Sequence, residues 1–526
     1  MAMAAQADLA ARPGDPGTVP APAPRTAAPP PTPGLFRPTG DAPWRPGATT
    51  LRRMDITADT TPSELAATRE RLRSAWRARK PDYAQRRADL LRLRDAFRAR
   101  VAEMDAAIQA DFGHRSSHEN LLSEAMITLA EIDHAIGRLR RWMRPRRAAV
   151  GWRFWPARAE IRPEPVGVVG ILSPWNYPVN LALVPLVSAI AAGNHVYLKP
   201  SEHTPRTSAY LRELLAEVFP ADRVAVAMGG AEVGAAFSAL PFDHLLFTGS
   251  TAVGRKVMAA AAPNLTPVTL ELGGKAPAVI CDDFPIELAA SRIASGKWFN
   301  AGQTCIGVDY VLVDAARRDA LVAALQAELR RRYGQLDAPQ DYTRIINDSQ
   351  YARLRGYLDD ARARGLQVIE PFAIDPDTAA RERLFAPTLV IEPGADAQVM
   401  QHEIFGPILP VLSYRNLDEA IARINALDRP LALYPFGYDR AQVERILGQT
   451  LAGGVTVNDT LLHFGAHDLP FGGIGPSGIG AIHGRNGFDT FSKLLPVFRQ
   501  RRMAASDWLK PPYTGKIDRL IRLLSK

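Results

Sequence analysis

The chain contains only two cysteines, Cys281 and Cys305, in 526 residues. Two cysteines cannot form a disulfide framework, so we expect a reducing compartment, with the cytoplasm as the default. Long apolar runs are also missing, because no stretch approaches the roughly 18 apolar residues that a membrane-spanning helix requires. The hydrophobic fraction of 47% and the charged fraction of 23% are ordinary for a globular protein. The chain is too long for one hydrophobic core, and we expect two or three lobes.

The N-terminal segment differs from the rest. Residues 1–55 are rich in Pro, Ala and Gly and show no apolar periodicity. They lack the apolar core of about 7 or more residues that marks a secretory signal. A transit peptide is disfavoured, because the segment contains acidic residues and no Arg-rich amphipathic pattern. We therefore predict a disordered leader over residues 1–55.

The formal net charge of +9 is unevenly distributed. Residues 493–526 hold nine Lys or Arg against Asp507 and Asp518, and a second basic cluster runs from Arg138 to Arg162. A basic chain can bind nucleic acid, but no zinc-finger, KH or RNP signature accompanies these clusters. We interpret them as solvated faces and predict no nucleic-acid partner.

Apolar periodicity predicts helices first and then alternating strands and helices. Residues 62–147 carry apolar residues three and four apart, which indicates helices. Further on, β-branched runs alternate with helical stretches, a pattern typical of βαβ units and a parallel sheet. These runs are 165–172, 193–199, 223–229 and 243–249, followed by a second set beginning at "APAVICD". We predict two α/β lobes with a boundary near residues 272–277.

Cys305 lies in "NAGQTCIGVDY", a glycine-containing turn that can present a side chain rather than bury it. A thiolate is a nucleophile, and polar donors favour that form. Cys281 closes the apolar strand "PAVIC" and is interpreted as a small core residue. Two partners are candidates: Glu271, before a Gly-Gly pair, as a general base, and Asn176, on a turn between two prolines, as an oxyanion donor. Each can also be an ordinary turn residue.

A second group of residues points to a cofactor. Gly249-x-Thr251-x-x-Gly254 stands between a predicted strand and a predicted helix, where free N–H groups attract phosphate. Thr251 replaces the second glycine of the dinucleotide fingerprint, so the match alone is weak and a plain strand–helix turn is the alternative. Lys199 and Glu202 end a neighbouring strand, where an open α/β sheet binds its ligand. A surface ion pair is the alternative for these two.

Six segments, in their order and spacing, resemble the NAD(P)-dependent aldehyde dehydrogenase superfamily. They are "SPWNYPVNLALVPLVSAIAAGNHVYLKPSE", "FTGST", "LELGGKAP", "NAGQTC", "HEIFGPILPV" and "PFGGIGPSGIGAIHG". The resemblance covers roughly residues 60 to 495. The chain is most similar to the class 3 branch and its bacterial relatives, such as coniferyl aldehyde dehydrogenases, because of "GQTCIGVDYVL" and of "IHG" followed by "GFDTFSK".

The resemblance implies a role for each matching residue. Cys305 falls on the nucleophile, Glu271 on the general base and Asn176 on the oxyanion donor. The implied reaction is oxidation of an aldehyde to a carboxylic acid through a thiohemiacetal and a thioester on the cysteine. The implied cofactor is NAD, with NADP as an alternative, and no metal is expected. The implied cofactor contacts are Trp175, Lys199, Glu202, Gly249, Ser250, Thr251, Gly254, Glu403 and Phe405.

The resemblance also implies an α/β aldehyde dehydrogenase fold, with a Rossmann-type cofactor domain, an α/β catalytic domain and a small oligomerisation arm. A homodimer is implied, with a tetramer as the alternative. The expected divisions are a helical part of the cofactor domain at 56–147, a first arm segment at 148–162, the dinucleotide-binding domain at 163–272, the catalytic thiolate domain at 273–470, a glycine-rich return and arm at 471–500, and a basic amphipathic tail at 501–526.

Two other functions stay open: a non-catalytic binding protein of the same fold, and a relative that passes the thioester to coenzyme A or phosphate. Glu271 favours water as the acceptor, because a general base is most useful for hydrolysis. Tyr177, Trp298, Phe299 and the loop 461–464 suggest an apolar aldehyde, aromatic or long-chain, although they can equally be core residues.

The tail has the pattern of an amphipathic helix. Its apolar residues fall largely on one helical face and its basic residues on or beside the other, the apolar set being Ile517, Leu520, Ile521, Leu523 and Leu524. Such a helix can lie on an anionic membrane surface. We favour packing against the body or the dimer partner, because most amphipathic helices in soluble proteins face a core.

Overall fold

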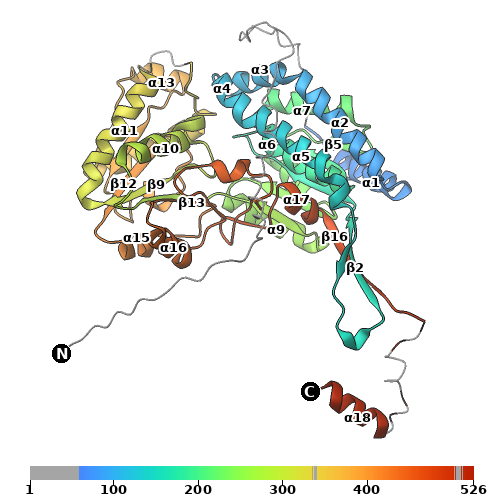
Figure 1. Cartoon of the computed structure of the whole chain (residues 1–526). Coiled ribbons are helices and arrows are strands. Elements are labelled where there is room, and N and C mark those ends of the chain that lie inside the picture. The colour runs from blue at the N-terminus through green and yellow to red at the C-terminus, as the bar shows by residue number, and fades with distance from the viewer. Residues whose placement is uncertain are drawn as a thin grey trace, which may run out of the picture. The chain divides into compact units, whose positions relative to one another are not determined.

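The computed structural model describes residues 59–334, 336, 340–502, 504, 511, 513 and 515–525. The predicted leader at 1–55 lies outside these residues. Over the described part of the chain, the strands form three sheets, two of them mostly parallel and one small and antiparallel (Figure 1). The predicted α/β class is confirmed.

The first sheet has the strand order β15-β7-β6-β3-β4-β5. Its neighbouring strands are parallel except β15, which runs antiparallel to β7. Every residue of β3, β4 and β6 is buried, as expected for parallel strands with both faces covered, and this explains their continuous apolar runs. The strands are β3 (Val168–Leu172), β4 (His195–Lys199), β5 (Val224–Val226), β6 (His244–Thr248), β7 (Val268–Glu271) and β15 (Gly478–Ile479).

The helices around this sheet come mainly from the N-terminal half. Every residue of α6 is buried between the sheet and the helices α2 and α5, so its sequence "NLALVPLVSAIAA" has no polar face. The elements are α1 (Pro62–Ala78), α2 (Tyr83–Ala99), α3 (Val101–Phe112), α4 (Ser117–Asn120), the π-helical turn η1 (Leu121–Met126), α5 (Ile127–Trp142), α6 (Asn180–Ala192), α7 (Pro205–Val218), α8 (Ala231–Ser238), α9 (Thr251–Ala261), the 3-10 turn η3 (Ala262–Asn264) and α17 (Gly484–Thr490).

The second sheet has the strand order β10-β11-β12-β9-β8-β13-β14 and is parallel except at β10. Its strands are β8 (Pro277–Ile280), β9 (Tyr310–Asp314), β10 (Gln367–Ile369), β11 (Thr388–Ile391), β12 (Ile408–Tyr414), β13 (Ala432–Phe436) and β14 (Gly454–Val455). Its helices are α10 (Ile286–Trp298), α11 (Arg318–Tyr333), α12 (Asp348–Ala363), α13 (Pro376–Glu382), α14 (Gln398–Gln401), α15 (Leu417–Asn425) and α16 (Arg440–Gln449), with 3-10 turns η4 (Phe299–Gly302), η5 (Ala315–Arg317) and η6 (Leu462–Gly465).

The third sheet, the arm, has the antiparallel order β1-β2-β16 (Figure 1). It consists of β1 (Arg146–Ala148), β2 (Arg158–Pro165) and β16 (Ser492–Arg499), and the 3-10 turn η2 (Trp152–Phe154) lies between the first two. The tail forms the predicted helix as α18 (Gly515–Leu524). Among the described residues, no helix has both the length and the apolar character needed to cross a membrane.

The glycine-rich return connects the end of the chain to the first sheet beside Glu271. In the β15–β7 pair Gly478 lies opposite Glu271, and the Leu272 N–H donates to the Ser477 carbonyl over 3.1 Å. Gly478 has φ 154°, and a side chain there would collide with the Leu270 carbonyl, so glycine is required. The end of β7, which carries Glu271, is therefore paired with β15 on the side away from β6.

Candidate active site

The turn that holds Cys305 follows an abrupt end to helix α10. The chain adopts left-handed conformations at Asn300 and Ala301, with φ of 53° and 50°, and then at Gly302. A side chain at Gly302 would collide with the Gly406 carbonyl, so this close approach requires glycine. These three residues turn the chain back toward the first sheet.

Cys305 occupies the second position of a turn in which the Gly307 N–H donates to the Thr304 carbonyl over 2.9 Å. Its side chain is half-buried, whereas Cys281 is fully buried in the core. The two cysteines therefore differ in access, and only Cys305 is open to a reactant. This difference is the one expected from their sequence contexts.

Asn176 lies against the Cys305 turn, although the two are far apart in sequence. Its side-chain amide donates to the Gln303 carbonyl over 3.1 Å. The Asn300 amide in turn donates to the Asn176 and Gln303 carbonyls, each over 3.1 Å. These bonds join the turn after β3 to the turn after α10, and they hold the Asn176 amide against the turn that carries Cys305.

Glu271 is the last residue of β7, and its carboxyl group is buried. Neither carboxyl oxygen has a hydrogen-bond partner among the described residues. Burial raises the pKa of Glu271 well above its ordinary value, because the charged form loses its hydration. A carboxyl in such a site is suited to accepting a proton during catalysis.

Glu403 reaches the same region from the loop after α14. A side chain at Gly273 would collide with its carboxyl group, so the Gly-Gly pair that follows Glu271 makes room for Glu403. Its Oε1 atom is buried without a hydrogen-bond partner in the described part of the chain. Burial and then the charge of Asp309 raise the pKa of Glu403 to about 8.

The carboxyl groups of Glu271 and Glu403 affect the pKa of the Cys305 thiol. Burial, followed by the negative charges of Glu403 and Glu271, raises the pKa of the Cys305 thiol to about 12. The backbone N–H groups of Ile306 and Cys305 act in the opposite direction. The thiol is therefore protonated at neutral pH in the unliganded protein, and its activation requires a proton acceptor or a change of local charge.

The cofactor candidates Lys199 and Glu202 form an ion pair at the carboxyl end of β4. The ammonium group donates to the Glu202 carboxylate over 2.8 Å, and Lys199 is only 4% exposed. Burial acts to raise the pKa of Glu202, but the hydrogen bond and charge of Lys199 make the net shift a lowering. Because Lys199 is largely buried, this pair is not a surface ion pair. Its place at the carboxyl edge of a parallel sheet fits the binding of a polar ligand.

Helix α9 begins directly after β6 and points its first N–H groups toward the same edge. The Ser250 hydroxyl caps this helix, and the Thr251 hydroxyl donates to a carbonyl of the glycine-rich return over 3.0 Å. Side chains at Gly249 or Gly254 would collide with neighbouring apolar residues. The two hydroxyls thus bond within the protein, while the helix N-terminus suits a diphosphate.

Trp175 and Phe405 bring aromatic surface from both sheets to the site. Their rings meet edge to face with centroids 5.4 Å apart, and Phe405 has a left-handed φ of 48°. Both side chains are half-buried. Together with the unpartnered Glu403 oxygen, the Lys199–Glu202 pair and the α9 N-terminus, they fit a dinucleotide.

Of the residues suggested as an aldehyde pocket, Phe299 is half-buried in the 3-10 turn η4, and two others have contacts within the protein. Trp298 is fully buried, and its indole N–H donates to the Pro407 carbonyl over 3.0 Å, so it is a core residue. Tyr177 is buried with its hydroxyl 2.6 Å from the Thr304 Oγ1. Phe464, in the loop 461–464, stays half-buried.

Sequence reasoning missed Arg115 and Glu124, two fully buried charges that support the Asn176 turn. Arg115 donates to the Asn176 carbonyl over 2.9 Å and to the Glu124 carboxylate over 3.3 Å. Glu124 accepts the N–H groups of Val179 and Asn180 over 3.1 and 2.7 Å. Glu124 lies in the π-helical turn η1, a form found often at functional sites. Apolar periodicity shows which face is buried but not that two charges meet inside it.

A second missed pair holds the loop that carries Glu403. Lys275 and Asp309 form a buried ion pair, and the lysine also donates to the carbonyls of Val399, in α14, and His402, directly after it, over 2.7 and 3.0 Å. Asp309 accepts the Ile404 N–H over 3.0 Å. Lys275, directly after the Gly-Gly pair, was a signal that the sequence offered for this site. Its partner Asp309 is distant in sequence, so the pair itself could not be predicted.

Comparison with known proteins identifies the family. The profile of the aldehyde dehydrogenase family matches residues 45–496. The chain is 49% identical over 460 residues to a probable coniferyl aldehyde dehydrogenase of Pseudomonas aeruginosa, covering 87% of this chain and 96% of that protein. It is 42% identical over 430 residues to aldehyde dehydrogenase family 3 member A2 of Rattus norvegicus, covering 81% and 87%. The chain belongs to the aldehyde dehydrogenase family, as the sequence predicted.

Comparison with solved structures gives the same family and shows its fold. A substrate-bound state of Staphylococcus aureus AldH superposes with a TM-score of 0.83 at 37% identity, covering 88% of this chain and 99% of that one. The NAD+ complex of an aldehyde dehydrogenase from Bacillus cereus has a TM-score of 0.77 at 26% identity, covering 85% of this chain and 90% of that one. The protein is thus an oxidoreductase with the predicted aldehyde dehydrogenase fold.

Proposed function

We propose that Cys305, Glu271 and Asn176 oxidise an aldehyde to a carboxylic acid. The observation that carries this proposal is the hydrogen-bonded junction of Asn176 with the Cys305 turn, beside the unpartnered Glu271 carboxyl. The Cys305 thiol gives up its proton to water, the sulfur adds to the carbonyl carbon, and the resulting oxyanion accepts hydrogen bonds from the Asn176 amide and the Cys305 N–H. The product of this step is a thiohemiacetal on Cys305.

Glu271 then supports hydrolysis. NAD(P)+, when bound, would accept the hydride that the thiohemiacetal carbon loses on becoming a thioester. The Glu271 carboxylate takes a proton from water, the water oxygen attacks the thioester carbon, and the sulfur leaves and regains a proton. Its free carboxyl oxygens favour water over coenzyme A or phosphate as the acceptor.

The cofactor proposal uses the polar edge of the first sheet. Lys199 and Glu202 would hold the ribose and the N-terminus of α9 the diphosphate, with Gly249, Ser250, Thr251 and Gly254 shaping that helix start. Trp175, Glu403 and Phe405 would flank the nicotinamide end. The NAD+ complex of the Bacillus cereus relative supports this use of NAD(P).

We propose an apolar aldehyde, aromatic or long-chain, as the substrate. The similarity to a protein named as a probable coniferyl aldehyde dehydrogenase supports the aromatic choice. Phe464 is half-buried and offers apolar surface in the loop after β14, and its ring packs edge to face on the buried Phe471 with centroids 4.8 Å apart. A reducing compartment such as the cytoplasm remains our proposed location, since both cysteines are unpaired.

Initial rates with aromatic, long-chain and short aldehydes, each with NAD and NADP, test the substrate and the cofactor together. We expect the highest kcat/KM with an apolar aldehyde and NAD, because the Glu202 carboxylate repels a 2′-phosphate and neutralises the Lys199 charge that would attract it. Glu202→Gln should shift the preference toward NADP. Glu213→Gln, on the exposed face of α7, is the charge-matched control. A strong NADP preference that survives Lys199→Ala would contradict this reading.

We propose a homodimer built through the arm. The proposed divisions are a cofactor domain at 56–147 and 163–272, a catalytic domain at 273–470, a first arm segment at 148–162, and a glycine-rich return and arm at 471–500. Among the described residues β16 pairs on one side with β2, and its other edge carries no strand. It exposes Leu494, Leu495 and Phe498, and an apolar edge strand favours pairing with another chain.

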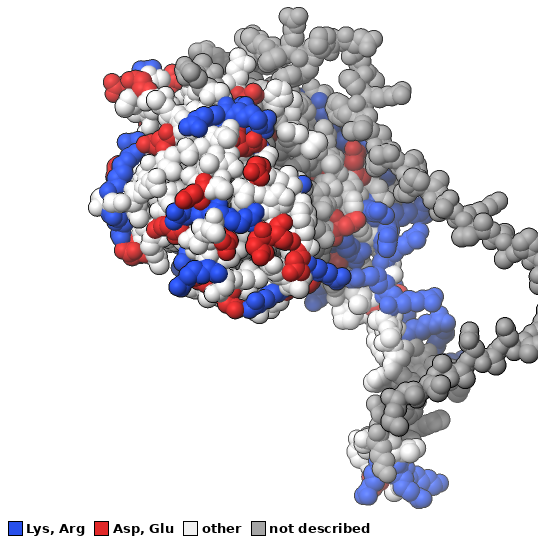
Figure 2. All heavy atoms as spheres, turned by 60° about the vertical axis from the view of Figure 1, so that its left-hand side comes forward, with Lys and Arg blue, Asp and Glu red and all other residues white. Residues whose placement is uncertain are grey.

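The rounded upper part of the face in Figure 2 has no field of a single sign, because Lys and Arg are interspersed with Asp and Glu over its described residues. The narrow lower part of the same view shows mainly Lys and Arg among its charged residues. Helix α18 exposes Ile521 and Leu523. We propose that this apolar face packs against the body or the second copy rather than on a membrane.

Truncating the chain at residue 510 tests the tail, and Leu495→Glu tests the arm. We expect sedimentation equilibrium to show a dimer for the full chain and weaker association or lower stability for the truncated chain. Leu495→Glu should give monomers, because burying an unpaired charge at an interface is costly. Leu265→Glu, at an exposed leucine of the cofactor domain, should stay dimeric. Co-sedimentation of the full chain with anionic vesicles, lost on truncation, would support the membrane alternative instead.

A further inference from the structure

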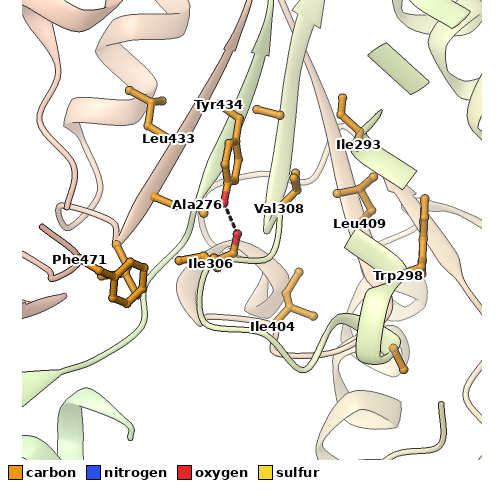
Figure 3. Packing of buried hydrophobic residues seen from close by; sticks show 14 of the residues in the cluster. Ala276, Ile293, Trp298, Ile306, Val308, Ile404, Leu409, Leu433, Tyr434 and Phe471 are labelled. Carbon is orange, nitrogen blue, oxygen red and sulfur yellow. Dashed lines mark hydrogen bonds between the residues drawn. The ribbon is translucent and has the colours of Figure 1, made fainter. Parts of the chain in front are cut away.

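Tyr434 joins the second sheet to the turn of the nucleophile. It lies in β13 and is fully buried. Its hydroxyl donates to the Ile306 carbonyl, directly after Cys305, as the dashed line in Figure 3 shows. Apolar residues surround this contact, among them Ala276, Val308 and Leu433 (Figure 3). Burial raises the pKa of Tyr434 well above its ordinary value, so the phenol stays a neutral donor.

Tyr177 makes the matching contact on the other side of the cysteine. It is buried in the turn after β3, and its hydroxyl lies 2.6 Å from the Thr304 Oγ1. Thr304 precedes Cys305 and Ile306 follows it. The residues on both sides of the nucleophile are therefore held by tyrosine hydroxyls that come from two different sheets.

We infer that the hydroxyls of Tyr434 and Tyr177 are positioning groups that orient the Cys305 turn for thiolate formation, an inference that rests on the proposed function of Cys305. The bond to the Ile306 carbonyl fixes the peptide plane between residues 306 and 307, and it thereby limits rotation of the adjoining plane, whose Ile306 N–H faces the sulfur. That N–H lowers the pKa of the Cys305 thiol against the larger effects of burial and the two carboxyls. A residue 306 that is free to rotate would lose this support.

A purely structural role makes a different prediction. Phenylalanine fills the same volume at position 434, so a role in packing would survive the loss of the hydroxyl apart from the cost of an unpaired carbonyl. Tyr414 provides a matched control. It is buried in β12, and its hydroxyl donates to the Ile280 carbonyl over 2.7 Å, directly before Cys281. Tyr414→Phe removes the same kind of bond beside the other cysteine.

The experiment measures alkylation of Cys305 by iodoacetamide in the full chain between about pH 7 and 10, with the Cys305 and Cys281 peptides separated by mass spectrometry. We expect the rate at Cys305 to fall roughly three- to tenfold at each pH in Tyr434→Phe, as the loss of one buried hydrogen bond implies. Tyr177→Phe should act in the same direction. Tyr414→Phe should match the wild type at Cys305, and kcat should fall more than KM rises in both positioning variants.

Several outcomes separate the possibilities. If Tyr434→Phe and Tyr177→Phe both give the Tyr414→Phe profile, while their unfolding midpoints fall equally, the hydroxyls are structural and the inference is wrong. If Tyr434→Phe does not fold, the Tyr177→Phe profile decides in the same way. If the wild type keeps its activity after Cys305 is fully alkylated, the proposed function itself fails, whatever the tyrosine variants do.

Discussion

Replacing Cys305 by alanine is expected to abolish aldehyde oxidation. The thiol is the half-buried member of the two cysteines, and it lies beside the Asn176 amide and two carboxyls that lack full hydrogen bonding. Without the sulfur no covalent intermediate forms, and the loss should exceed about a thousandfold in kcat. Reduction of NAD(P)+ followed by absorbance, on protein shown to be folded by circular dichroism, gives the measurement.

Cys281→Ala is the matched control for this substitution. Cys281 is fully buried near the end of β8, so its removal leaves a small cavity and costs stability rather than chemistry. We expect most of the activity to remain at a temperature where the variant is folded. Equal loss in two folded variants would contradict the assignment of Cys305 as the nucleophile.

Replacing Glu271 by glutamine is expected to stop turnover after the first step. The amide cannot take a proton from water, so the thioester should accumulate, and a burst of reduced cofactor should be followed by a slow steady state. Stopped-flow absorbance resolves the two phases. Because burial raises the pKa of Glu271, its base form becomes populated as the pH rises. The wild-type steady state should therefore increase with pH, and the variant should lose that increase.

Glu403→Gln distinguishes the two carboxyls near the sulfur. Glu403 lies on the loop beside Phe405, at the proposed nicotinamide end, so its amide variant should slow the burst itself. A burst that disappears in Glu271→Gln would assign that carboxyl to an earlier step, such as removal of the thiol proton. A burst that persists in both variants, with hydrolysis unaffected by Glu271→Gln, would remove Glu271 from the mechanism.

Much of the fold was predictable because the relevant signals are local. The runs at 165–172 and 193–199 became the fully buried strands β3 and β4, since a strand covered on both faces needs apolar residues throughout. The contrast between Cys281, at the end of an apolar strand, and Cys305, in a glycine-containing turn, was also readable from neighbours in the chain.

The support around the site was not predictable from such signals. Arg115 lies in the loop between α3 and α4 and Glu124 in the π-helical turn η1, and their buried ion pair depends on the turn that packs against them. The Lys275–Asp309 pair and the Tyr434 bond to the Ile306 carbonyl depend on contacts between distant segments. Apolar periodicity indicates which face of a helix or strand is buried. It does not indicate which polar groups on distant segments will form hydrogen bonds or ion pairs with each other.

The α/β class, the strand ends that carry Glu271 and Lys199, and the turn that presents Cys305 could all be predicted, because each follows from residue type and spacing along a short stretch. The hydrogen bond from Asn176 to the carbonyl of Gln303, 127 residues away, and the pairing of β15 beside Glu271 became known only from the folded chain. The physical reason is that these contacts depend on how two separately formed sheets pack, and that arrangement is set by the whole core rather than by any one segment.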